Sequence, residues 1–132
     1  MDYYASASAD NIRFARSKII MAPADGLHNV IRVPSKAFLL DTFIQVVAPY
    51  SSGSTGAITV GLVGEVNDPD GLLVDTYINS EAAGISRASG GSAAYSEGYW
   101  FQKSGAISIT TAKGDSSADI ACVVFAFFSV LH

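Results

Sequence analysis

Charge is what this sequence has least of. The chain has 132 residues with 8 Lys+Arg and 12 Asp+Glu, so charged residues make up 15% and the net charge is −4. A soluble domain usually has about 25% charged residues. Nucleic-acid binding needs a dense stripe of Lys and Arg, and the small number of these residues argues against such a partner. Because 49% of the residues are hydrophobic, disorder of the whole chain is excluded. We therefore expect a folded domain that has a Ser/Thr/Gly surface, buries surface against partner chains, or both.

Cysteine, histidine and long apolar runs are also scarce. Cys122 stands alone, so no disulfide within the chain and no cysteine-based zinc site can form. His28 and His132 offer little material for a metal site. A membrane helix needs about 20 consecutive apolar residues, and the stretch from Ile120 to Leu131 is too short. The first residues lack the pattern of a signal peptide. We expect a protein that folds in a reducing cytoplasm without membrane or cofactor.

Helical periodicity is missing from every window, whereas short apolar runs alternate with clusters of Gly, Ser, Pro, Asn and Asp. Residues 1–11 are Ala/Ser-rich and are predicted to form a flexible N-terminal arm, with Tyr3 and Tyr4 as partner contacts. Residues 12–132 are predicted to form an all-β domain: an antiparallel β-sandwich of jelly-roll type with about 7–8 strands. The expected strands are Ile12–Met21, Leu27–Val33, Ala37–Ala48, Ala57–Gly64, Tyr95–Lys103, Ala106–Ala112 and Asp119–Leu131, with a short helical turn within Leu72–Glu81.

Two hairpins are predicted from the alternation of apolar residues. The third and fourth expected strands would pair with Ala48 opposite Ile58, and the last two with Ala112 opposite Asp119. A shift of one residue in the first hairpin would mix apolar and polar side chains, so burial favours this register. The predicted core faces consist of Ile44, Val46, Ala48, Ile58, Val60, Leu62, Ile107, Ile109, Cys122 and Val124.

The last strand is apolar on both faces, because Val123, Phe125 and Phe127 lie opposite its core residues. A strand packed on one side should alternate apolar and polar residues. Either another part of the same chain, such as a loop or the N-terminal arm, covers these side chains, or a neighbouring subunit does. The low charge favours the subunit, so Val123, Phe125 and Phe127 are predicted to form an oligomer interface.

No catalytic motif stands out. The sequence has no Gly-x-Ser-x-Gly nucleophile elbow, and a thiol in the core, as expected for Cys122, is inert. Three carboxylates, Asp68, Asp70 and Asp75, could bind Ca²⁺. An EF-hand alignment fails, and the run Asn67–Gly71 favours a turn. We predict no enzyme and leave the calcium site open.

Aromatic residues gather near one expected strand, with Tyr99 and Phe101 on one face and Trp100 on the other. An exposed ring could stack against a sugar, as in a lectin, but core packing is the more frequent role of such residues.

Several segments carry a family likeness. Ile58–Gly64 runs into Asn67–Leu72, and Ser104–Thr110 precedes the apolar run Val123–Phe128. Across residues 55–131 this pattern resembles the small β-sandwich virion proteins of tailed bacteriophages, both capsid decoration (cement) proteins and tail-associated jelly-roll modules.

The resemblance implies a non-enzymatic virion structural protein, most of all a capsid cement protein, assembled in the host cytoplasm. It would form a homo-oligomer, expected to be a trimer, and bind the major capsid protein or another virion protein. The alternative is a carbohydrate- or receptor-binding module of the tail-fibre or lectin type.

Overall fold

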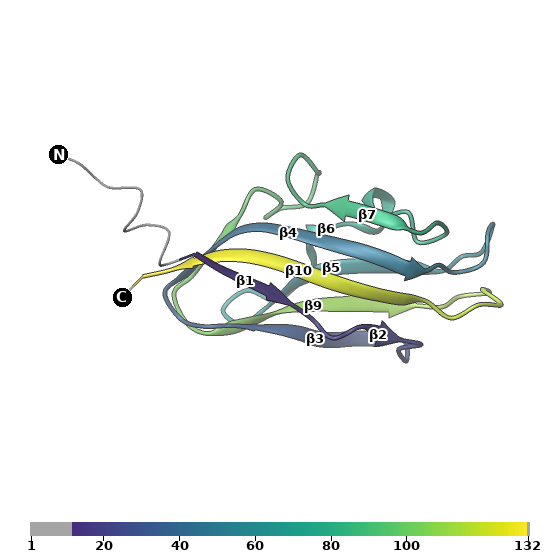
Figure 1. Ribbon diagram of the computed structural model, residues 1–132, viewed down its shortest axis with the longest axis horizontal. Helices are drawn as coiled ribbons and strands as arrows, with labels where there is room; N and C mark the ends of the chain where they lie inside the picture. The colour runs from purple at the N-terminus through teal and green to yellow at the C-terminus, as the bar shows by residue number, and fades with distance from the viewer. Residues whose placement is uncertain (1–11, 132) are drawn as a thin grey trace.

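The structure, a computed structural model, describes residues 12–131. Short strands form two antiparallel sheets that stack face to face (Figure 1). Sheet A has the order β1 (Ile12–Arg16), β10 (Ala121–Val130), β4 (Ala37–Ala48) and β7 (Gly84–Arg87). The short strands β2 (Ile20–Met21) and β8 (Tyr99–Phe101) add to β10 and β4 of this sheet. Sheet B has the order β3 (Gly26–Val33), β9 (Gly105–Ala112), β5 (Ala57–Val63) and β6 (Asp68–Leu73).

The strand order is that of a jelly roll. The outermost strands of the chain pair with each other, and so do the next ones inward: β1 with β10, β3 with β9, β4 with β7, and β5 with β6. Eight principal strands in two sheets are the hallmark of this fold. The predicted all-β, jelly-roll sandwich is therefore confirmed.

Both predicted hairpins are wrong, because the chain crosses from one sheet to the other where a hairpin was expected. Ala48 pairs with Ala121 rather than with Ile58. Ala112 pairs with Ala57 rather than with Asp119. The apolar faces that were matched in the sequence do meet, but across the core between two sheets rather than side by side within one.

The core lies between the sheets and contains nine of the ten residues predicted for it; the prediction for Ala48 is wrong, because this residue at the end of β4 is exposed. All nine are at most 3% exposed, and Cys122 is fully buried. The larger buried side chains that join them come from β3, β4, β6, β8 and β10 and from the loops: Val33, Leu39, Tyr50, Leu72, Leu73, Ile78, Phe101, Ile120 and Phe128.

Local differences from the predicted strands have simple causes. The first expected strand divides into β1 and β2 at Ser17, whose hydroxyl accepts a hydrogen bond from the Val124 N–H (3.0 Å). The predicted turn at 67–71 is wrong, since Asp68 begins β6 and the bend occupies residues 64–66. Pro69 is tolerated because β6 is an edge strand. The expected helical turn is present as η1 (Asp75–Tyr77). The predicted arm with Tyr3 and Tyr4 lies outside the described residues.

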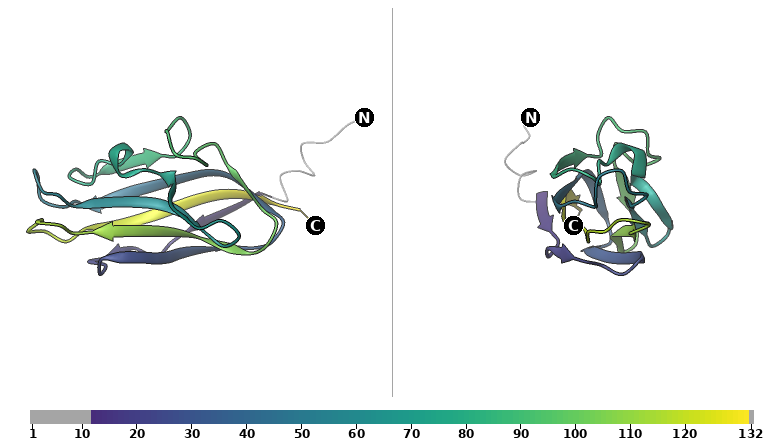
Figure 2. Two further views of the ribbon diagram at one scale, coloured as in Figure 1. Left: turned by 180° about the vertical axis from the view of Figure 1, so that it is seen from behind. Right: turned by 90° about the vertical axis from the view of Figure 1, so that its right-hand side faces the viewer.

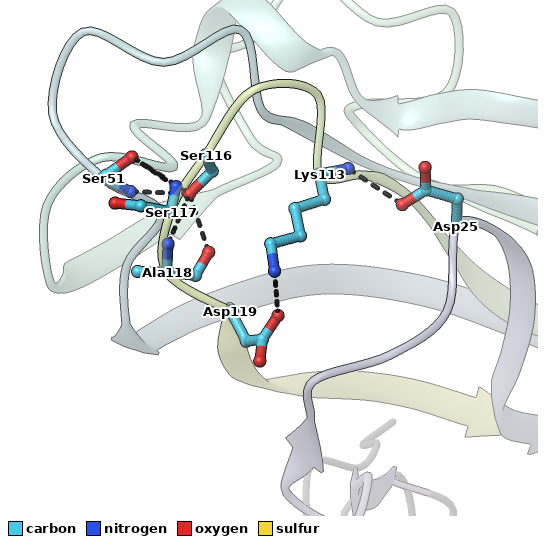
Figure 3. Close-up of polar contacts among 7 residues, drawn as sticks. All are labelled: Asp25, Ser51, Lys113, Ser116, Ser117, Ala118 and Asp119. Carbon is cyan, nitrogen blue, oxygen red and sulfur yellow. Dashed lines mark hydrogen bonds and ion pairs between the residues drawn. The ribbon is translucent and has the colours of Figure 1, made fainter.

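Serine side chains join the two loops that cross between the sheets at one end of the molecule (Figure 3). The Ser51 N–H donates to the Ser116 hydroxyl (2.9 Å), and the Ser117 N–H donates to the Ser51 hydroxyl (3.1 Å). Next to them, the Lys113 N–H donates to the Asp25 carboxylate (2.9 Å). These bonds fix the β4–β5 and β9–β10 crossovers to each other and to the start of β3.

Candidate functional site

The outer face of sheet A exposes a set of large apolar side chains. Strand pairing places Phe14 of β1 beside Phe127 of β10, and Phe125 of β10 beside Phe43 of β4. Since paired residues of antiparallel strands point to the same side of a sheet, these rings share one face. We define the apolar face by its exposed members on sheet A: Ile12, Phe14, Phe38, Leu40, Val47, Ile85, Trp100 and Phe127.

Aromatic rings form the centre of the apolar face. Phe14 lies 4.9 Å from Phe127 and 6.0 Å from Phe125, measured between ring centroids. Phe43 meets Phe127 edge to face at 6.2 Å. Phe14 nevertheless remains 57% exposed and Phe127 36% exposed, so the described residues leave this cluster open to a partner.

The predicted interface residues all lie on β10 and point outward, but they differ in exposure. Val123 is only 4% exposed, Phe125 is half-buried, and Phe127 is exposed. Val123 has little area left to bury against another molecule. The sequence reasoning missed Phe14 and Phe38. Phe38 alternates with the core-facing Ala37 and Leu39, which marks an outward position. Phe14 lies between exposed Arg13 and half-buried Ala15 and carries no such signal.

One ion pair interrupts the apolar face. Arg87 of β7 donates to the Asp41 carboxylate of β4, with Nη2–Oδ2 and Nε–Oδ2 distances of 2.6 and 2.7 Å. Its guanidinium also lies 5.5 Å from the centroid of the Phe43 ring. The hydrogen bond that Arg87 donates to the Asp41 carboxylate raises the pKa of Arg87. The pair adds a polar, directional contact beside the aromatic rings.

The acidic residues considered for calcium do not form a metal centre. Asp68 and Asp70 share a hydrogen bond, which together with burial raises the pKa of Asp68, while Asp75 belongs to η1. Within residues 12–131, no group of three His, Cys, Asp or Glu side chains is placed to hold a metal ion.

The residues considered for nucleophilic catalysis and for sugar stacking are engaged in other contacts. The His28 Nε2 lies 2.6 Å from the Ala24 carbonyl oxygen, and burial raises the pKa of Cys122 to about 11. Tyr99 and Phe101 do share one face, with ring centroids 4.8 Å apart. Trp100 points the other way, is 37% exposed, and packs beside Phe38 at 6.1 Å. It therefore belongs to the apolar face.

None of the helical segments in residues 12–131 has the length and apolar character needed to cross a membrane.

Comparisons with known proteins locate the fold but no family. No family model matches the sequence, and no curated protein matches it. A chain of the acidic stable capsid of Helicobacter pylori bacteriophage KHP30 superposes with a TM-score of 0.68 at 12% identity, covering 90% of this chain and 87% of its own. A chain of the capsid of Ralstonia phage GP4 gives 0.66 at 19% identity, with 92% and 85% covered. A chain of the cyanophage Pam1 capsid asymmetric unit gives 0.58 at 11% identity, with 92% and 86% covered. This chain is similar to all three in fold over nearly its whole length.

Proposed function

We propose that this protein is a non-enzymatic structural component of a tailed-bacteriophage virion, most specifically a capsid decoration (cement) protein. It self-associates, as a trimer, and binds the shell that the major capsid protein forms. Three chains from phage capsids support the virion role, because each shares the fold over most of both chains. Residues 1–11, with Tyr3 and Tyr4, are proposed to contact a neighbouring subunit.

The observation that carries the proposal is the apolar face. Soluble monomers rarely expose large contiguous apolar patches, and patches of this kind mark protein interfaces. Eight large apolar side chains between 36% and 65% exposed lie on the outer side of one sheet. Their burial against another protein is the most direct explanation for a surface with so few charges.

The mechanism is mass action without chemistry. A protein that binds the assembled shell but not its dissociated subunits stabilises the shell by RT ln(1 + [L]/Kd). At a free concentration of 100 times Kd this amounts to about 2.7 kcal/mol for each site. Many weakly stabilised sites on one shell then add up to a large resistance to disassembly.

Shell binding is tested with capsids assembled without this protein. Added protein should co-sediment with such capsids and raise their disassembly temperature, whereas a Phe127→Asp variant should bind and stabilise them less. Circular dichroism of that variant checks that it remains folded. Failure of the folded wild-type chain to co-sediment contradicts the cement role. Glycan-array binding that disappears on Trp100→Ala would support the carbohydrate-binding alternative instead.

A further inference from the structure

Basic residues gather along one long edge of the sandwich. Residues 12–36, which contain β1, β2 and β3, carry five basic residues and one acidic residue, a net charge of +4. The acidic residue, Asp25, directly precedes β3 and accepts a hydrogen bond from the Lys113 N–H (2.9 Å). We name this side of the molecule the basic edge: Arg13, Arg16, Lys18, Arg32 and Lys36.

Acidic residues gather along the opposite edge. Residues 64–98, which contain β6, η1 and β7, carry six acidic residues and one basic residue, a net charge of −5. The basic residue is Arg87, which is paired with Asp41. We name this side the acidic edge: Glu65, Asp68, Asp70, Asp75, Glu81 and Glu97.

Sheet topology places the two edges on opposite sides of the molecule. β1 and β7 are the outer strands of the main path of sheet A, and β3 and β6 are those of sheet B. A groove lined by Ser17, Lys18, Ile20, Asn29 and Val30 connects the β1–β2 segment with β3. On the other side, the Tyr95 N–H donates to the Gly71 carbonyl (2.7 Å), which ties the segment after β7 to β6. Figures 1 and 2 show β7 on one side of the strand stack and β2 with β3 on the other.

We propose that copies of this chain associate head to tail, with the basic edge of one copy against the acidic edge of the next. This inference rests on the self-association in the proposed function and specifies its geometry. A two-fold interface joins identical patches, so it would set +4 against +4 or −5 against −5, and like charges across an interface disfavour pairing. A head-to-tail interface matches opposite charges and can close into a ring such as a trimer.

Both edges also carry exposed apolar residues that such an interface would bury. On the basic edge Ile19 is 57% and Met21 75% exposed, and on the acidic edge Tyr77 is 42% and Ile85 65% exposed. An apolar centre with charged surroundings is the usual anatomy of a protein interface.

Some carboxylates of the acidic edge already hold their own loops. Glu81 accepts the Gly53 N–H (2.6 Å), and Glu97 accepts the Gly90 N–H (2.7 Å). Asp70 and Asp75 are exposed, and within residues 12–131 neither side chain accepts a hydrogen bond from a loop N–H. Asp70 shares a hydrogen bond with Asp68. Asp70 and Asp75 are therefore the acidic residues whose reversal tests the interface without loosening a loop.

Charge reversal tests the inference by sedimentation equilibrium of the full chain. Lys18→Glu with Arg32→Glu reverses part of the basic edge, and Asp70→Lys with Asp75→Lys reverses part of the acidic edge. Each double variant should weaken association by at least tenfold, because the charge of the basic edge falls from +4 to 0, or that of the acidic edge changes from −5 to −1. The quadruple variant sets 0 against −1 and should associate no more tightly than either double variant. Wild-type association should also weaken as salt rises from 0.05 to 0.5 M.

The matched control is Lys103→Glu with Lys113→Glu, which changes the net charge as much as the basic-edge variant does but alters none of the residues that define either edge. The N–H groups of Lys103 and Lys113 that donate to Glu65 and Asp25 belong to the backbone and remain in the control. It should associate as the wild type does, and circular dichroism should show that all variants fold. Wild-type association in the quadruple variant, or unchanged association in both edge variants, overturns the head-to-tail geometry. If Phe127→Asp abolishes association while the edge variants do not, self-association stands and the edges are the wrong surface. A monomeric wild-type chain overturns self-association itself.

Discussion

Replacing Phe14 by Ser is the sharpest test of the apolar face, because this ring belongs to the edge strand β1 and is 57% exposed. Its contacts with Phe125 and Phe127 are its visible packing on that face. The substitution therefore removes more apolar surface that a partner would cover than apolar surface already buried in the folded monomer.

The magnitude follows from the exposed fraction. A Phe side chain offers about 200 Å², so 57% exposure leaves roughly 110 Å² for a partner to cover. At about 25 cal/mol per Å² this is worth about 2.8 kcal/mol, or roughly 100-fold in the dissociation constant. The part already covered, roughly 90 Å², limits the loss of monomer stability to about 2 kcal/mol.

Co-sedimentation with capsids assembled without this protein, over a concentration series, measures the dissociation constant, and urea unfolding measures monomer stability. Leu27→Ser is the matched control, because Leu27 is 46% exposed but belongs to β3 of sheet B. We expect a roughly 100-fold weaker association for Phe14→Ser and a much smaller change for Leu27→Ser. Equal effects of the two substitutions would refute the assignment of the interface to sheet A.

Three further predictions concern stability. Burial raises the pKa of Cys122 to about 11, whereas an unfolded thiol has a pKa of about 8.5. The free energy of unfolding should therefore fall as pH rises between these values, by up to about 1.4 kcal/mol per pH unit. Urea titrations at alkaline pH should show a weaker pH dependence of stability for Cys122→Ala. Asp115→Ala removes the acceptor of the Thr55 N–H (2.6 Å) and should cost about 1 kcal/mol, whereas an unchanged melting temperature would mean that this loop contact is not stabilising. In Gly61→Ala the new Cβ would lie 2.5 Å from the Pro69 carbonyl oxygen, which should force β5 and β6 apart and cost about 3 kcal/mol or more; wild-type stability in urea would disprove that close approach.

The sequence predicted the core well, because burial requires apolar alternation wherever the partner strand lies. β4 has the predicted bounds, Ala37–Ala48, and Ile44 and Val46 face the core as expected. The same alternation could not predict the pairing. Ile58 and Val60 of β5 satisfy an apolar face equally well beside β4 or opposite it across the core, and only the complete sheet order decides.

The edge strands and the full extent of the candidate site were harder to predict. β6 begins with Asp68-Pro69-Asp70, residues typical of turns, yet an edge strand leaves one row of backbone groups unpaired and so tolerates proline. The apolar face combines residues from β1, β4, β7, β8 and β10. Val123, Phe125 and Phe127 marked its middle strand, but the neighbours that complete it, Phe14 among them, depend on pairings between distant parts of the chain.

The position of β10 has a consequence for biosynthesis. This last strand lies between β1 and β4 in sheet A, so the strands made early cannot be joined until residues 121–130 have left the ribosome. Such distant pairing slows folding. A chain that ends prematurely lacks the strand that carries Phe125 and Phe127 and that links β1 to the rest of its sheet. Incomplete translation products would thus be unable to present the apolar face, and only finished polypeptides would compete for places in an assembly.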